Sequence, residues 1–232
     1  MITVRVTARD FWCLFREVSP KAALGYLWDI VRSQLYLTTD EVIVRKDFAA
    51  EPPTTAGTIR LEEAQAHHLA LLAEFNHRQC NTARTHRFAM GLAEGRQALL
   101  GFRDGELIGY FWWHDARQAA DGFYLSRFGV RLAGDEMYGY DLFVAPEHRG
   151  SGTPVEFLAA IEAELVRLGY RAMYGFVDAR NVPGRWLWAS SGYADVMRGR
   201  TRRVLRRLML VEGRGWLVSG RRGMRPLTRS RC

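Results

Sequence analysis

The residues best suited to chemistry form a glycine-bearing loop that joins a predicted strand, residues 137–144, to a predicted helix, residues 154–168. The loop carries Arg149, Gly150 and Gly152. A strand–loop–helix junction directs several backbone N–H groups and the positive end of a helix dipole at one spot, and glycine lets an anion come close to the backbone. The pattern therefore indicates a phosphate-binding loop, with a plain structural turn as the competing explanation.

A second group of residues follows the next predicted strand: Asn181, with Trp188, Gly192 and Tyr193 downstream. The first loop reads V-x-P-x-x-R-G-x-G. In this order the two groups resemble the motifs of the GNAT N-acetyltransferase superfamily, whose second motif reads N-x6-Y-x3-G-F. The resemblance covers roughly residues 57–211. It implies an enzyme that moves an acetyl or longer acyl group from acyl-CoA to an amine by direct attack.

On this resemblance the donor, acetyl-CoA or another acyl-CoA, would lie in a V-shaped split between the strand that ends at Val144 and the strand that begins near Arg171. Backbone groups of Phe143 and Val144 would meet the pantetheine arm, and Asn181 would contact its lower part or order the loop. The pyrophosphate would be bound by the amides of Gly150, Ser151, Gly152 and Thr153, with Arg149 beside them.

Two positions depart from the family pattern. Pro154 replaces the usual glycine or alanine at the end of the loop and removes one N–H donor. A capping box is also predicted from Thr153, Pro154 and Glu156, and it would place the carboxylate of Glu156 on the loop amides. Trp188 stands where many family members carry a tyrosine that protonates the leaving thiolate. An indole donates a hydrogen bond but does not titrate near neutrality, so either water protonates the thiolate or catalysis is weak.

A general base should lie close to the acceptor amine. Asp141 is the first candidate, because it stands on the strand just before the expected pantetheine-binding residues; a salt bridge or a solvated sheet position is its alternative. His114, at the end of a predicted strand, is the second candidate, with a plain surface position as its alternative. Trp188, as a hydrogen-bond donor to the sulfur, completes the predicted catalytic set.

The elements that must position these residues are strands interspersed with helices. Strand patterns cover 58–61, 98–103, 106–114, 137–144, 172–177 and 203–210, and helical patterns cover 62–75, 82–92, 154–168 and 183–190. Asp104-Gly105 between two apolar runs is a strong hairpin signal. The order and the resemblance predict an α/β protein of the α+β type: a GNAT-like mixed, largely antiparallel sheet with a splayed central strand pair and helices on both faces.

Four segments are predicted along the chain. They are an N-terminal helix–strand extension (1–48), a proline-containing linker (49–57), a GNAT-like acyltransferase domain (58–211) and a basic, flexible tail (212–232). The extension is too short to form a sufficient core of its own and is expected to dock on the main domain.

The positive charge is concentrated in the last part of the chain. The formal net charge is +8, but residues 198–232 contain twelve arginines and one acid, a net +11, which leaves −3 for residues 1–197. Such an arginine run can bind nucleic acid electrostatically. A solubilising terminus is the preferred explanation, and nucleic acid is not an expected partner.

The three cysteines are widely spaced, and the histidines form no tight cluster. We therefore expect no metal site, reduced thiols, a cytoplasmic location and no membrane span. The expected partners are acyl-CoA and a small amine or a protein amine, with a homodimer left open. A catalytically weak GNAT-fold binding protein and a nucleic-acid binder are the alternative hypotheses.

Overall fold

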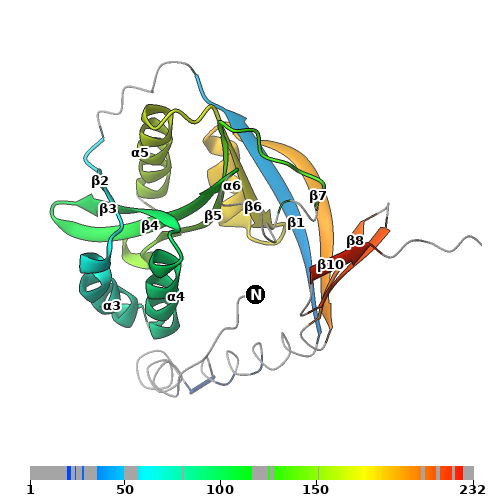
Figure 1. Ribbon diagram of the computed structural model, residues 1–232. Coiled ribbons are helices and arrows are strands. Elements are labelled where there is room, and N and C mark those ends of the chain that lie inside the picture. Colours follow the sequence, from blue (N-terminus) through cyan, green and yellow to red (C-terminus); the bar gives the residue numbers. More distant parts are fainter. Residues whose placement is uncertain are drawn as a thin grey trace, which may run out of the picture.

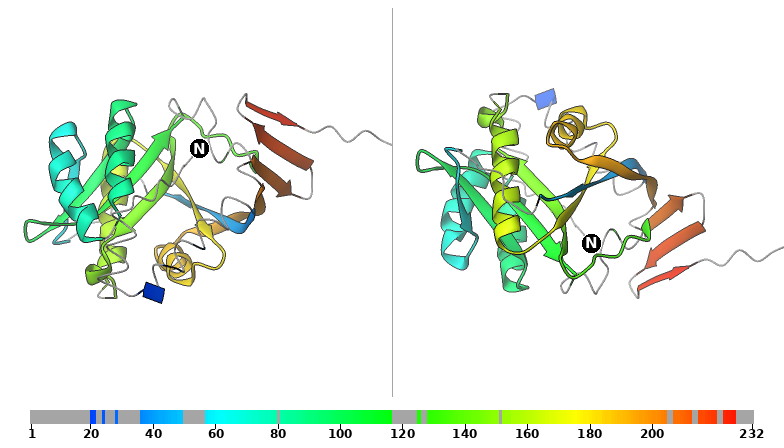
Figure 2. Two further views of the ribbon diagram at one scale, coloured as in Figure 1. Left: turned by 90° about the horizontal axis from the view of Figure 1, so that it is seen from below. Right: turned by 90° about the horizontal axis from the view of Figure 1, so that it is seen from above.

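The computed structural model describes residues 20, 21, 24, 28, 36–49, 57–79, 81–116, 125, 128–150, 152–204, 207–212, 215–220 and 223–226. They form a ten-stranded sheet with the order β10-β9-β8-β7-β1-β6-β5-β4-β3-β2 (Figures 1 and 2). All neighbouring strands are antiparallel except β5 and β6, which are parallel. The predicted class, a mixed and largely antiparallel sheet with helices, is therefore confirmed.

The strands are β1 (Tyr36–Asp47), β2 (Arg60–Glu63), β3 (Gln97–Arg103), β4 (Glu106–Asp115), β5 (Glu136–Val144), β6 (Ala172–Asp178), β7 (Ala194–Val204), β8 (Arg207–Glu212), β9 (Gly215–Gly220) and β10 (Gly223–Pro226). The helices are α3 (Leu69–Arg78), α4 (Thr82–Ala93), α5 (Thr153–Arg167) and α6 (Val182–Ser190), with short 3-10 turns η2 (Ala66–His68) and η5 (Pro146–His148). The helix predicted from residue 62 begins later, because β2 and η2 occupy its first half.

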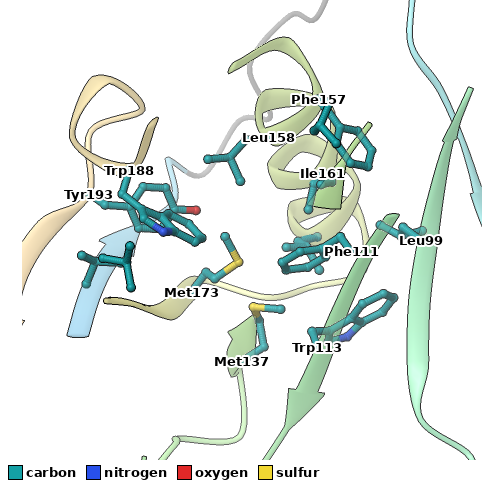
Figure 3. Packing of buried hydrophobic residues seen from close by; sticks show 14 of the residues in the cluster. Leu99, Phe111, Trp113, Met137, Phe157, Leu158, Ile161, Met173, Trp188 and Tyr193 are labelled. Atoms are coloured by element: carbon teal, nitrogen blue, oxygen red, sulfur yellow. The ribbon is translucent and has the colours of Figure 1, made fainter. Parts of the chain in front are cut away.

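Helices cover both faces of the sheet, and each pair has its own apolar cluster. Helices α5 and α6 pack on one face, where Phe157, Ile161 and Trp188 join buried side chains of β4, β5 and β6. Figure 3 shows Phe157, Leu158 and Ile161 directed from α5 toward the sheet, with Trp188 beside them. Helices α3 and α4 cover the opposite face through a second cluster that includes Phe75 and Phe88 (Figure 1).

Strand β1 lies inside the sheet, between β6 and β7, and is antiparallel to both. Val42 and Val44 join the α5/α6 cluster, whereas Ile43 is buried on the opposite face. A salt bridge of 2.6 Å from Lys46 Nζ to Glu162 Oε2 joins β1 to α5. This strand was predicted as part of a docked extension; it is instead an interior strand of the sheet, and its middle, Val42–Val44, is buried and apolar on both faces. The helix of the predicted N-terminal extension lies almost entirely outside the described residues.

The C-terminal segment differs from the predicted flexible tail. Strands β8, β9 and β10 extend the sheet from β7 through successive antiparallel pairings. The single strand predicted at 203–210 is divided between the end of β7 and most of β8. The successive hairpins provide hydrogen-bond partners for the backbone of this segment, although its glycine, proline and arginine content is typical of loops.

Gly109 marks a close approach between β4 and β5. A Cβ atom at this position would collide with the carbonyl oxygen of Phe143. We predict that Gly109→Ala lowers the free energy of unfolding by about 1–3 kcal/mol, because backbone atoms of β5 must shift to accept the methyl group. Urea unfolding followed by circular dichroism measures this change.

The control is Gly134→Ala, since a Cβ atom there would meet nothing within 4 Å. Equal stability of the two variants would contradict the close packing of β4 on β5.

Candidate donor loop and adjoining acidic site

The glycine-bearing loop runs from the end of β5 at Val144, through η5, to the start of α5 at Thr153. Gly150 has φ 91° and Gly152 has φ 81°, which are left-handed values that favour glycine. A Cβ atom at either position would meet nothing within 4 Å, so the space beside this backbone is open. Ser151, also predicted to bind the donor, lies outside the described residues. The loop therefore offers backbone that an anion can approach closely.

The predicted capping box at the start of α5 is wrong. The N-cap residue is Gly152, and no side chain caps the helix. The buried hydroxyl of Thr153 instead accepts a hydrogen bond of 2.7 Å from Arg103 Nη1, and Glu156 forms a salt bridge with the same guanidinium. Arg103 thereby neutralises the carboxylate that we expected on the loop amides, and the helix N-terminus keeps its positive character.

The strand pair beside this loop separates early. Strands β5 and β6 are paired only from Glu136 to Tyr138 on β5 and from Ala172 to Tyr174 on β6. From there to Val144, β5 is paired with β4 alone among the described strands. The split that we predicted from the family resemblance is therefore present as a divergence of two parallel strands.

The pairing with β4 decides which backbone groups of β5 face the split. Ala145 N–H donates to Ile108 C=O at 2.9 Å, so Gly109 and Val144 form a non-hydrogen-bonded pair. The N–H and C=O of Val144, and by alternation those of Leu142, then point away from β4. Those of Phe143 point toward β4, which differs from the contact predicted for this residue. Arg149 Nε donates to Val144 C=O at 2.9 Å.

Asp141 lies on the face of the sheet that α3 and α4 cover. The pairing of β4 and β5 shifts so that Trp112 faces Asp141 and Trp113 faces Gly139, which makes Tyr140 the extra residue of a β-bulge. Such a bulge re-aims the next side chain. The hydroxyl of the buried Tyr110 donates to Asp141 Oδ2 at 3.5 Å.

The surroundings of Asp141 raise the pKa of its carboxyl group. Burial raises the pKa of Asp141, while the positive charges of Arg84 and Arg87 on α4 and the hydrogen bond from Tyr110 act in the opposite direction. Burial also raises the pKa of the Tyr110 hydroxyl well above its ordinary value, so Tyr110 stays a neutral donor. A carboxylate whose pKa is raised binds a proton more readily, which makes Asp141 a candidate general base.

The other two predicted catalytic residues lie in different surroundings. His114 is partly buried on β4 and stacks on Tyr140, with ring centroids 4.5 Å apart. Trp188 is 7% exposed and belongs to the apolar cluster under α5 and α6. Its ring packs edge-on against Tyr193 at 4.6 Å and covers Gly175, where a Cβ atom would lie 3.0 Å away. Packing accounts for the position of Trp188.

Asn181 caps helix α6. Its Oδ1 accepts a hydrogen bond of 3.1 Å from Gly184 N–H, and its backbone N–H donates to Asp178 C=O at 2.8 Å. This hydrogen bond orders the start of α6, and the contact predicted between Asn181 and the pantetheine arm stays a prediction.

Three arginines near the site are not evident as site residues from the sequence: Arg84, Arg87 and Arg103. The i, i+3 spacing of Arg84 and Arg87 on a predicted helix places them on one face, but no local pattern shows which strand that face meets. Arg103 contacts Thr153, fifty positions away in the sequence, and no spacing rule links the two.

Neither a metal centre nor a membrane-crossing helix is found in the described part of the chain. It contains no group of three or more His, Cys, Asp or Glu side chains that could hold a metal ion. None of its helices is both long and apolar enough to cross a membrane.

Comparison with protein families gives one match: the model described as Acetyltransferase (GNAT) family covers residues 59–193. No curated protein matches the chain.

Solved structures resemble the fold at low sequence identity. A conserved protein of unknown function from Staphylococcus epidermidis has a TM-score of 0.53 and 9% identity over 81% of this chain and 68% of its own. A GNAT-family acetyltransferase from Colwellia psychrerythraea has a TM-score of 0.49 and 13% identity, over 77% of this chain and 61% of its own. A predicted acetyltransferase from Clostridium acetobutylicum, solved with acetyl-CoA, has a TM-score of 0.40 and 16% identity, over 60% of this chain and 91% of its own. The chain thus spans less than two thirds of the Colwellia protein.

The cap at Asn181 leads to a test that separates its two predicted roles. We predict that Asn181→Ala lowers the free energy of unfolding by about 1 kcal/mol, because α6 loses its side-chain cap. Asn181→Asp should retain the stability, since aspartate is an equally good cap. Urea unfolding of the three proteins measures the difference. Unchanged stability in Asn181→Ala together with weakened acetyl-CoA binding would instead favour a ligand contact.

Proposed function

Because the chain belongs to the GNAT acetyltransferase family, we propose that it is an N-acyltransferase that moves an acetyl or longer acyl group from acyl-CoA to an amine acceptor. The observation that carries this proposal is the start of α5, where no side chain caps the helix and two glycines leave the adjoining backbone open. The family alone does not identify the acceptor, because one fold serves many substrates.

The donor fits the described residues in three respects. The backbone at Gly150 and Gly152, with the positive end of α5, would bind the pyrophosphate. The N–H and C=O groups of Leu142 and Val144 face the split and would pair with the amides of the pantetheine arm. Arg149, which holds Val144 C=O at 2.9 Å, would move its side chain toward the phosphates as the arm takes over that carbonyl.

The reaction needs one base and one leaving group. The donor supplies an activated thioester carbonyl, which the acceptor nitrogen attacks so that a C–N bond replaces the C–S bond and the thiolate leaves with the electron pair. Asp141 takes the proton that the nitrogen loses, directly or through water. The hydrogen bond from Tyr110 holds the carboxylate in place for this transfer.

We assign Trp188 a packing role in this mechanism. A thiolate whose conjugate acid has a pKa of about 8–9 is a tolerable leaving group, so water suffices to protonate it. The rate then depends mainly on the proximity of amine and thioester and on the proton transfer to Asp141.

The first prediction concerns the donor. Calorimetric titration should show that acetyl-CoA binds the protein, and Arg103→Gln should weaken this binding roughly 3- to 10-fold, because Glu156 then places an unneutralised charge beside the helix N-terminus. Adding Glu156→Gln to Arg103→Gln should restore the affinity.

Two results would contradict this expectation. Absence of binding at millimolar acetyl-CoA would overturn the proposed function. Failure of Glu156→Gln to restore affinity would show that Arg103 acts otherwise than by neutralising Glu156.

The second prediction concerns the base. Asp141→Asn should lower kcat/KM about 10²- to 10⁴-fold, the usual contribution of a general base. In the unsubstituted protein kcat/KM should fall as the pH drops through the raised pKa of Asp141, because protonation removes the base. Thiol release should be measured from acid to alkaline pH. The fall of kcat/KM toward acid pH, which is the acid limb of the profile, should be absent in Asp141→Asn.

His114→Gln is the matched comparison, since His114 is the second candidate base. It should keep the acid limb, and both variants should bind acetyl-CoA as tightly as the parent. Loss of the limb in His114→Gln alone would transfer the role to the histidine.

A further inference from the structure

Two arginines on α4 face the same region of the sheet as Asp141. Arg84 and Arg87 are three residues apart on the helix and therefore share a face. The guanidinium of Arg84 lies 4.0 Å from the ring centroid of Phe143 on β5. Both positive charges act on the Asp141 carboxyl group. Two cations and one carboxylate thus gather on the α4 side of β5.

Among the described residues, one of these cations, Arg84, has a side-chain donor without a hydrogen-bond partner. Nε of Arg84 is buried, and within the described part of the chain no hydrogen-bond acceptor reaches it. Both arginine side chains are partly buried, so their charges are less well solvated than those of surface arginines. Such a cation would be stabilised by an anion that approaches from outside the protein, in addition to the Asp141 carboxylate.

The neighbouring arginines on the donor side differ in this respect. Arg103 binds Thr153 and Glu156, and Arg149 holds Val144 C=O. Arg84 and Arg87 are instead on α4, the helix that covers Asp141, and Arg84 shares the ring of Phe143 with Arg149. An anion bound by them would therefore lie next to the base.

A guanidinium recognises carboxylate and phosphate groups through paired hydrogen bonds, whereas an ionised carboxylate recognises an ammonium group. A ligand that pairs with all three charged side chains carries an ammonium group and, a short distance from it, a carboxylate or phosphate group. An amine that lacks an anionic group would pair with Asp141 and bring no anion to the two arginines. The arrangement of charges in the cluster therefore favours amines that also carry an anionic group.

We propose that Arg84 and Arg87 bind an anionic group of the acceptor, and that the acceptor is a small amine that also carries a carboxylate or a phosphate. This inference rests on the proposed function, since it takes Asp141 as the base that meets the amine. It assigns the two arginines to substrate selection, and the chemistry stays with Asp141.

The test compares matched acceptors with acetyl-CoA as the donor. One arm pairs amino acids with their carboxamides, and the other pairs glucosamine 6-phosphate with glucosamine; thiol release gives kcat and KM for each. We expect the anionic member of at least one pair to have the higher kcat/KM, and the two arms distinguish a carboxylate from a phosphate.

Substitution of the two arginines then tests whether they cause this preference for anionic acceptors. Arg84→Gln and Arg87→Gln should each raise KM for the anionic acceptor roughly 10- to 100-fold, as expected for loss of a charged hydrogen bond. KM for acetyl-CoA and for the acceptor that lacks the anionic group should stay the same. Arg167→Gln is the control, because Arg167 pairs with Glu164 near the far end of α5.

Each contrary result has a definite meaning. Thiol release only from amines that lack an anionic group, or an equal effect of Arg84→Gln on both members of a pair, overturns the inference and leaves the proposed function intact. A rise in KM for acetyl-CoA in Arg84→Gln also overturns it, since the arginine then serves the donor. If acetyl-CoA binds but no acceptor reacts, this acceptor class is wrong. If acetyl-CoA does not bind, the proposed function fails as well.

Discussion

The early end of pairing between β5 and β6 is the constraint on which the rest of the site depends. The two strands are neighbours over three residue pairs only. Beyond them β5 stays bound to β4, and β6 is bound at its other edge to β1. Each strand is therefore held by an outer neighbour while the inner edges separate. Backbone groups in a protein need hydrogen-bond partners, so the inner edge of β5 is the natural place for a ligand that brings its own donors and acceptors.

The apolar packing around the split depends on aromatic rings that lie against glycines. Phe111 covers Gly139, where a Cβ atom would come within 2.6 Å of the ring, and Trp188 covers Gly175. Phe157 covers Gly101 in the same way, with a ring atom even closer to where a Cβ atom would lie. Large rings fill the space on the α5/α6 face where strand pairing stops, and they leave no room for side chains at those glycines. The packing on this face is therefore close on both sides of the divergence.

Local patterns were sufficient for most elements and insufficient for the contacts between them. The spacing of Leu158, Ile161 and Leu165 predicts α5 to within a residue of its observed bounds. The capping box failed because Arg103, far away in the sequence, binds both residues that would have formed it. The face occupied by Asp141 depends on a β-bulge, and the place of β1 depends on pairing with strands more than a hundred residues later. Neither the face occupied by Asp141 nor the place of β1 in the sheet can therefore be predicted from a local sequence pattern.

The interior position of β1 has a consequence for the order in which the protein acquires its structure. β1 is synthesised before the other nine strands, yet both of its partners, β6 and β7, begin only at Ala172 and Ala194. At ribosomal rates of about 5–20 residues per second, the apolar run Val42–Val44 waits on the order of ten seconds for a partner strand. Contacts of such large sequence separation also slow folding, because a long loop must close before they form. The nascent chain therefore carries an unpaired, aggregation-prone strand until the second half of the sheet has been made.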